Sequence, residues 1–530
     1  MTDTTAGGRH TTPGAERLAT VLKLILLFLP ALWMAGYLFP PINHDAASIL
    51  DVCKRWLNGE TLYFDIIDVQ APLVFLLYSV PELVSRATGM EAPTALTLCL
   101  IAAIAWSFLL VRRSLRMVGV AQQPLTGALL PAMSLFLMAV FPLDNFGQRE
   151  HFMLVVSLPY IFIAAARAER VAVPLRLALP IALLAGVGLG LKPHFVGIPA
   201  LVELYILARA GWGRWLRDPV PWLILAVFVF HLAFAWFVTP HYFSTALPLI
   251  FEAYVRLGEH SPWEVLSGAL VLPTLVALIL LAGAAFAWLG PLAHVNALYA
   301  IGAMMAAIVQ AKGWSYHMLP AVAATILLGA GLVTKTLDRY LPIDPHRHRL
   351  PVAIVTMAFM LLFYHEAALI DLPFKKQLEF RDSIGGRMLE LVKRAAPNKK
   401  ILVLSPGIYP HYPMVNYGGL RMTMRFQTMW PLQGIYADCP ELAPLYNPPD
   451  SMDQWERFVF RTVADDFARE KPDLLIVDRV AGIPRCRADT FNYLDYFSRN
   501  PLFAKALEAY EPYATIDRYE IWRRLSPRGQ

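Results

Sequence analysis

The sequence lacks the motifs by which many enzymes hold a nucleotide or a structural metal. It contains no zinc-finger spacing, no phosphate-binding loop and no dinucleotide fingerprint. It also lacks a basic patch with interleaved aromatic side chains, so nucleic acid is not an expected partner. Gly186 and Gly188 superficially resemble a glycine-rich loop, but they lie in an apolar run, where small residues allow close helix packing.

Cysteine and charge are both scarce. The 530 residues include four cysteines, and 16% of the residues are charged. Cys53 and Cys99 lie in or near apolar runs, where we expect them to act as small apolar side chains. Cys439 and Cys486 lie in the more polar C-terminal part, and we predict that they pair if that part is exported to an oxidising compartment.

Long apolar runs are abundant instead. Apolar residues make up 57% of the chain, and runs long enough to cross the ~30 Å hydrocarbon layer recur along it. We predict a polytopic α-helical membrane protein with about 11 transmembrane helices, near residues 20–39, 93–111, 124–143, 151–167, 175–191, 196–209, 220–238, 265–289, 295–311, 317–334 and 351–370. Residues 1–19 would be a cytoplasmic tail, and we expect the first span to be retained rather than cleaved.

The distribution of Lys and Arg predicts the orientation. Basic clusters follow alternate spans, as in cytoplasmic loops; they are Arg112, Arg113 and Arg116, then Arg167, Arg170 and Arg176, then Arg209, Arg214 and Arg217, and finally Lys335, Arg339, Arg347 and Arg349. The other side holds isolated basic residues. Counting Leu73–Val84 as a further span would invert every later loop, so we interpret it as a short interfacial or re-entrant helix.

The first external loop, residues 40–92, begins with an amphipathic helix. Its apolar face comprises Ala46, Ile49, Leu50, Cys53, Trp56 and Leu57. Asp45 at its head could be an N-cap, a general base whose pKa suits proton abstraction, or both. His44 beside it is either a surface histidine or a ligand. Asp65 and Asp68 either cap and solvate the loop or contact a substrate.

Further polar residues fall at the same, external ends of the predicted spans: Arg149, Glu150, His151, Lys192, His194, Lys312, Tyr316 and His317. Arg149 could clamp a phosphate, and Glu150 could pair with it, hold a metal or orient an acceptor. The alternatives are a surface ion pair and interfacial anchors. Together the cations would form a positive ring at the apolar boundary, which suits a lipid-linked phosphate.

The chain changes character at residue 371. The pattern predicts short buried strands at Lys399–Leu404 and Pro472–Asp478. It also predicts an amphipathic helix at Trp455–Arg469 and a further strand at Ala514–Arg523. Residues 371–530 therefore form a C-terminal α/β domain of ordinary size. An odd number of spans places this domain outside the cytoplasm.

Several of these features together resemble the integral-membrane glycosyltransferases of the GT-C fold, particularly the bacterial family related to protein O-mannosyltransferases and lipid A aminoarabinose transferases. The resemblance rests on four features: Asp45 after the first span, the segment Leu57–Asp65, the tripeptide Ala71-Pro72-Leu73, and the loop that contains Arg149 and Glu150. It implies a bacterial inner-membrane location with a periplasmic C-terminal domain.

The resemblance also implies a reaction. A polyprenyl-phosphate-linked sugar would be the donor, and a glycolipid, polysaccharide or protein the acceptor. Asp45 would be the base, and the transfer would invert the anomeric carbon. The family's Asp-Glu pair reads Asp45-Ala46 here, so the part played by a divalent metal stays open.

Two other classes remain. A transporter or flippase for a lipid-linked saccharide would show inverted repeats and spans broken at mid-membrane, for which Pro131 and Pro159 are candidates. A non-catalytic envelope assembly subunit would use its external domain for recruitment. Neither class needs a base at Asp45.

Overall fold

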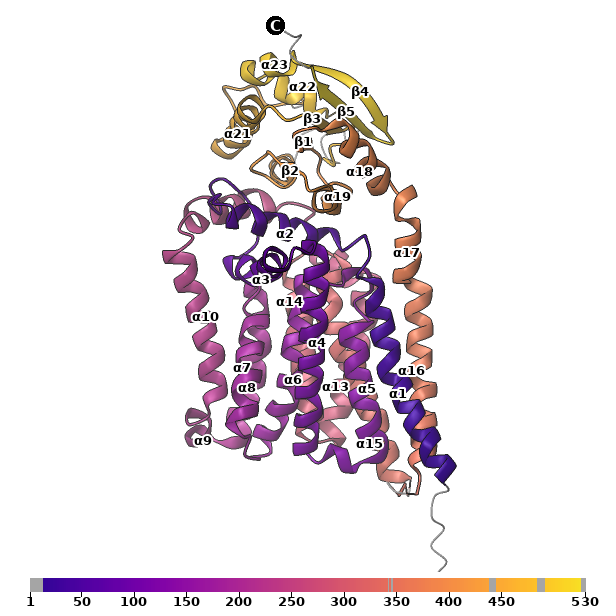
Figure 1. Cartoon of the computed structure of the whole chain (residues 1–530). Coiled ribbons are helices and arrows are strands. Elements are labelled where there is room, and N and C mark those ends of the chain that lie inside the picture. Colours follow the sequence, from indigo (N-terminus) through magenta and orange to yellow (C-terminus); the bar gives the residue numbers. More distant parts are fainter. Residues whose placement is uncertain (1–12, 342, 345–346, 438–444, 484–490, 526–530) are drawn as a thin grey trace, which may run out of the picture. The chain divides into compact units, whose positions relative to one another are not determined.

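The structure is a computed structural model, and it describes residues 13–341, 343–344, 347–437, 445–483 and 491–525 (Figure 1). Contacts divide the chain into two compact units. Unit 1 comprises residues 1–38, 99–228 and 262–373, and unit 2 comprises residues 39–98, 229–261 and 374–530. The first loop, residues 40–92, thus shares a unit with the C-terminal region. Cys439 and Cys486, for which we predicted a disulfide, lie outside the described residues.

Long helices make up unit 1 (Figure 1). Each predicted span coincides with a helix in the described residues: α1 (Pro13–Gly36), α4 (Ala92–Met117), α5 (Pro124–Ala139), α6 (Arg149–Ala168), α7 (Leu175–Leu189), α8 (Gly197–Ala210), α10 (Pro219–Phe237), α13 (Val271–Trp288), α14 (Pro291–Val309), α15 (Leu319–Tyr340) and α16 (Arg349–Ile370). Three boundaries between the units fall inside helices, in α4, in α10 and in α17 (Pro373–Glu379). Short elements connect the helices: η1 (Val120–Gln122), η2 (Leu143–Asn145), η3 (Pro193–Val196), α9 (Trp212–Leu216), α12 (Pro262–Leu266) and η6 (Ser315–Met318).

Length and composition support eight to ten of the eleven spans. Among the described residues, eight helical segments are long and apolar enough to cross a membrane, and α5 and α7 are apolar but shorter. Helix α8 has only 14 residues and carries Glu203 and Arg209, so it belongs neither to the long apolar helices nor to the shorter ones. A helical membrane protein is therefore confirmed, and the orientation of its helices stays a prediction.

Close packing places α6 at the centre of unit 1. Its apolar stretch is 94% buried. A Cβ atom added to Gly188 of α7 would lie 2.5 Å from Val156 of α6, so glycine allows these two helices to approach. Pro131 and Pro159 lie inside α5 and α6, which continue through them. The broken spans that the transporter interpretation expected at these prolines are not formed.

Unit 2 begins with two amphipathic helices, α2 (His44–Leu57) and α3 (Pro72–Thr88). Asn43 caps α2, since its side chain accepts from the backbone N–H groups of Asp45 and Ala46. Gly59 follows the helix with a φ of 98°, a conformation that glycine adopts without strain. The predicted helix at Leu73–Val84 is α3. Both helices pack together within the unit.

The C-terminal part of unit 2 contains a mixed five-stranded sheet in its described residues. The order is β2-β1-β3-β5-β4, in which β1 (Lys400–Leu404) pairs in parallel with β2 (Arg421–Met422) and with β3 (Leu474–Asp478). Strands β5 (Tyr519–Arg524) and β4 (Tyr510–Ile516) add in antiparallel fashion. The predicted single strand Ala514–Arg523 is wrong, because the chain turns at Asp517, whose φ is 50°, and forms a hairpin.

The helices of the C-terminal region are α17 (Pro373–Glu379), η7 (Phe380–Asp382), α18 (Ile384–Ala395), α19 (His411–Gly418), α20 (Trp430–Ile435), α21 (Gln454–Glu470), α22 (Tyr493–Ser498) and α23 (Pro501–Leu507). The segments η4 (Tyr242–Ala246), α11 (Leu247–Leu249) and η5 (Ile250–Tyr254) belong to the same unit. Its core includes Ile67 from the first loop, Leu249 and Ala253 as well as sheet residues. The first loop and the C-terminal region therefore share one core.

Candidate active site

Glu150 is the centre of a polar cluster in unit 1. It lies in the first turn of α6, where the helix dipole favours a carboxylate, and its side chain is fully buried. Lys192, which follows α7, places its Nζ 2.5 Å from Oε1 of Glu150. The same Nζ donates to Oε1 of Gln310 at 2.9 Å. Because a buried carboxylate is costly without a partner, this ion pair stabilises both charges.

A further cation and a histidine lie beside the pair. Nε of Arg149 lies 4.0 Å from Oε2 of Glu150, and Nε2 of His317 lies 3.9 Å from Oε1. Nζ of Lys192 stands 5.7 Å from the centre of the Tyr316 ring. Lys192, Arg149, His194 and Lys312 are all near His317. The structure thus brings together most of the cations that we predicted for a phosphate site. We name Arg149, Glu150, Lys192, Lys312 and His317 the Glu150 cluster.

His151, for which we predicted a contact with substrate, has a structural role in the turn before α6. The N–H of Gly147 donates to its Nδ1 at 3.0 Å. Nε2 therefore carries the proton and donates to the carbonyl of Met138 at 2.7 Å. Both ring nitrogens bind main-chain groups, and His151 fixes the turn between α5 and α6.

Asp45 lies in unit 2, in the first turn of α2, and is 8% exposed. Asn43 is the N-cap, so the interpretation of Asp45 as the cap is wrong. Nε2 of the half-exposed His44 lies 3.6 Å from its Oδ1. Capping therefore does not account for the Asp45 carboxylate.

Asp65 and Asp68 shape the loop between α2 and α3. Oδ2 of Asp65 accepts from the N–H of Thr61 at 2.9 Å, and Oδ1 of Asp68 accepts from the N–H of Gln70 at 2.8 Å. These bonds within tight turns favour the loop-capping alternative over direct contact with a substrate.

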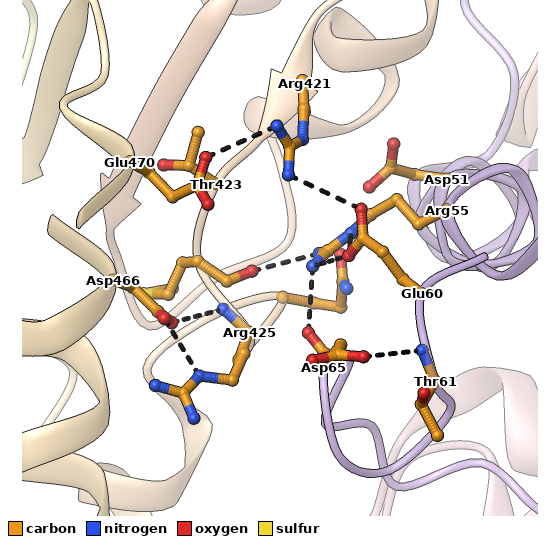
Figure 2. A network of polar contacts seen from close by, with 12 residues as sticks. Asp51, Arg55, Glu60, Thr61, Asp65, Arg421, Thr423, Arg425, Asp466 and Glu470 are labelled. Carbon is orange, nitrogen blue, oxygen red and sulfur yellow. Dashed lines mark hydrogen bonds and ion pairs between the residues drawn. The ribbon is translucent and has the colours of Figure 1, made fainter. Parts of the chain in front are cut away.

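Sequence reasoning missed the role of Arg55. Asp51 and Arg55 are not part of the apolar face that the sequence predicts for α2, yet both are buried. Figure 2 shows the Arg55 guanidinium among carboxylate and carbonyl oxygens. Its Nε donates to Glu60 at 2.8 Å, and its terminal nitrogens donate to the carbonyls of Met424 at 3.0 Å and Asp65 at 3.1 Å. One side chain thus joins α2, the first loop and the C-terminal region.

Asp51 extends this network. Its Oδ2 accepts from the hydroxyl of Tyr412 at 2.9 Å. Burial raises the pKa of Asp51, and the nearby Arg55 and the Tyr412 hydrogen bond oppose that rise. The backbone pairing of Ile67, whose N–H donates to the carbonyl of Arg425 at 2.8 Å, runs alongside. No sequence signal marks these contacts, since Asp51 and Tyr412 are 361 residues apart.

Ion pairs of the C-terminal region flank the network in Figure 2. Arg425 donates to Asp466 through both its backbone N–H and its Nε, each at 2.9 Å. Arg421 lies 3.9 Å from Glu60 and 3.4 Å from Glu470, and so links the first loop to α21. Together these pairs attach the first loop to the C-terminal region within unit 2.

The side chains of the described residues offer no site for a metal ion. Among the described residues, no group of three or more His, Cys, Asp or Glu side chains is arranged to hold one. The carboxylate of the Glu150 cluster is already engaged by Lys192.

Comparison of the structure with solved structures identifies the fold. It is similar to that of ArnT from Cupriavidus metallidurans in the apo state, with a TM-score of 0.54 and 12% sequence identity over 95% of this chain and 97% of that one. The oligosaccharyltransferase of Archaeoglobus fulgidus, in its complex with zinc and sulfate, matches with a TM-score of 0.40 and 13% identity over 94% of this chain and 71% of that one. No protein-family model and no curated protein matches the sequence.

The likeness to ArnT confirms the predicted resemblance at the level of the fold. ArnT is a GT-C membrane glycosyltransferase, and it combines a helical membrane part with a C-terminal α/β region as this chain does. The likeness extends over almost the whole of both chains. At 12% identity it shows the fold alone.

Proposed function

We propose that the protein is a membrane glycosyltransferase that moves a sugar from a polyprenyl-phosphate donor to a hydroxyl group of an acceptor outside the cytoplasm. The acceptor would be a glycolipid, a polysaccharide or a protein. The observation that carries the proposal is the Glu150 cluster, which gathers Arg149, Lys192, Lys312 and His317 at the ends of membrane helices. The GT-C fold supports it.

The cluster would bind the phosphate of the donor. Buried cations with N–H donors form short, strong hydrogen bonds to phosphate oxygens. Arg149 and Lys312 are each about 5% exposed or less, so such bonds would act in a medium of low polarity. Glu150 would be a positioning residue, because it holds Lys192 in place. The polyprenyl chain would lie against the apolar helices, and Tyr316 and His194 would border the head group.

Asp45 would be the general base. It would remove the proton from the acceptor hydroxyl as the oxygen attacks the anomeric carbon of the donor. The bond between that carbon and the phosphate oxygen would break, and the lipid phosphate would leave with the electron pair. Attack opposite the leaving group inverts the anomeric carbon. Cations of the cluster would stabilise the charge that develops on the phosphate.

The Lys and Arg distribution supports a location for this reaction. It predicts that the N-terminus is cytoplasmic and that the C-terminal region is external. We propose a bacterial inner membrane with a periplasmic C-terminal region, where lipid-linked donors and envelope acceptors meet.

Donor binding tests the role of the cluster. The purified full-length protein should bind a polyprenyl-phosphate sugar, and Arg149→Gln or Lys312→Gln should weaken binding by one to two orders of magnitude. This follows from the ~1.5–3 kcal/mol that a hydrogen bond to a charged group contributes. Lys375→Gln is the matched control, since Lys375 is an exposed cation beyond the last span. If both cluster variants bind donor as tightly as the control does, the cations are ordinary membrane anchors.

A further inference from the structure

A second site candidate in unit 1 is a cavity of about 430 Å³ between α1, α4, α5 and α16. Apolar side chains form much of its wall, among them Leu26, Leu27, Phe108 and Leu135. In Figure 1, α1, α5 and α16 run side by side, and contacts among these three helices agree with this view. The cavity is not part of the Glu150 cluster, because none of the cluster residues lines it.

Three cations line the same cavity. They are Lys23 of α1, Arg112 of α4 and Arg349 of α16, and each is exposed. Glu16 lies 3.9 Å from Arg349 at one edge, so positive charge still prevails. The guanidinium of Arg112 stands 5.9 Å from the centre of the Phe108 ring, which holds it beside the apolar wall. Positive charge and apolar surface thus meet at one place.

The apolar surface continues outward along the helices. On α1, Leu24, Phe28 and Leu32 are between 46% and 61% exposed, which in a membrane helix means that they face lipid. The cavity is also bordered by the first turn of α5, whereas the Glu150 cluster begins beyond the last turn of that helix. The cavity extends along α5 as far as Leu135, and it shares no lining residue with the Glu150 cluster.

We propose that this cavity binds an anionic phospholipid of the bilayer. Its phosphate would lie among Lys23, Arg112 and Arg349, and its acyl chains would cover the apolar wall and the exposed face of α1. Guanidinium groups match phosphate oxygens bidentately. Basic pockets between membrane helices on the cytoplasmic side are typical sites for anionic head groups, and Arg112 and Arg349 belong to the clusters that predict the cytoplasmic side.

A zwitterionic phospholipid fits less well. Its own ammonium group would be repelled by three cations, and Glu16 supplies one carboxylate to offset them. The expected preference is therefore for phosphatidylglycerol over phosphatidylethanolamine. The preference requires no sugar donor and is independent of the proposed transfer activity.

Native mass spectrometry of the full-length protein in a neutral detergent tests the proposal. The protein is titrated with phosphatidylglycerol or with phosphatidylethanolamine of matched chain length. Each basic residue near an anionic head group is worth roughly a factor of five in binding. The double variant Arg112→Gln/Arg349→Gln should therefore bind phosphatidylglycerol roughly 25-fold more weakly, with little change for phosphatidylethanolamine.

Arg113→Gln is the matched control. Arg113 is an exposed neighbour on the same helix that does not line the cavity, so its loss should change binding less than twofold. Equal binding of the two lipids by the unmodified protein, or an equal loss in the control, would overturn the proposal. So would a polyprenyl phosphate that displaces phosphatidylglycerol through Arg112 and Arg349, because the carrier lipid would then be the occupant.

Discussion

Arg55 should hold the first loop of unit 2 in place, and removing its side chain tests that role. Arg55→Ala removes the donors that reach Glu60, the carbonyl of Met424 and the carbonyl of Asp65. Glu60 is 23% exposed and can recover hydration, whereas the bond to Met424 is buried. Removing one partner of a buried ion pair typically lowers stability by ~3–5 kcal/mol. Since two carbonyl groups also lose their donor, we expect Arg55→Ala to destabilise the attachment of the loop by an amount in that range.

Hydrogen exchange of the full-length protein measures this loss locally. The amide of Ile67 donates to the carbonyl of Arg425, next to Met424, and reports whether the loop stays attached. A loss of ~3–5 kcal/mol should raise its exchange rate by roughly two to four orders of magnitude, provided that it exchanges through local opening.

Lys54→Ala provides the control, since Lys54 precedes Arg55 on α2 and is more exposed. Arg55→Lys should recover little protection, because one ammonium group cannot reproduce the guanidinium fork. An increase of less than about tenfold in Arg55→Ala, or an equal increase in Lys54→Ala, would show that Arg55 does not fasten the loop.

Two further predictions concern unit 2. Burial lowers the pKa of His411 from 6.5 to about 3, and neither ring nitrogen has a hydrogen-bond partner in the described residues. A histidine with a lowered pKa contributes its full stabilisation above pH 6.5 and loses it as the pH falls, because the unfolded state then binds the proton. Between pH 7 and pH 5 the free energy of unfolding should therefore fall by about 2 kcal/mol more in the unmodified protein than in His411→Phe, as measured by chemical unfolding. An equal dependence of the unfolding free energy on pH in both proteins would refute this. A Cβ atom on Gly434 would lie 1.9 Å from the carbonyl oxygen of Ala253, so Gly434→Ala should cost ~1–3 kcal/mol in thermal unfolding, and Gly283→Ala, which adds its Cβ to open space, should cost nothing comparable. Equal unfolding midpoints for the two glycine variants would contradict the close approach of α20 to η5.

The sequence predicted the membrane helices well, because their signal is local. Apolar runs of sufficient length depend on no distant contact, and each predicted span coincides with a helix in the described residues. The shortest ones, α5, α7 and α8, fall short in length, and α8 also carries charge. Burial of α8 residues such as Glu203, which pairs with Arg167, depends on tertiary contacts that composition does not show.

The structure of unit 2 was harder to predict, because contacts between residues far apart in the sequence determine which of its side chains are buried. The periodicity of α2 predicted its apolar face, but the burial of Asp51 and Arg55 depends on Tyr412 and Met424. Asn43 and Asp45 are both favoured caps two positions apart, and only the backbone geometry distinguishes them. The hairpin of β4 and β5 was missed because its turn at Asp517 contains neither glycine nor proline.

The candidate site was predictable in part. Topology placed Arg149, Lys192, Lys312 and His317 at the same ends of their spans, and the structure gathers them around Glu150. The alternatives for Glu150 included pairing with Arg149, yet its shorter contact is with Lys192. Which cation pairs with Glu150 depends on how the side chains of neighbouring helices meet in space, and the spacing of residues in the sequence does not show this.

Sugar transfer by Asp45→Asn tests the proposed function most directly. Asn43 caps α2, so the substitution keeps the cap and removes the carboxylate charge and its basicity. The variant should fold and bind donor like the unmodified protein, yet lose transfer by the ~10²–10⁴-fold that general-base catalysis contributes. Asp68→Asn, in a turn of the same loop, is the control and should keep most of its activity. Near-normal transfer by Asp45→Asn, measured as release of sugar from the lipid-linked donor to acceptor, would contradict the account.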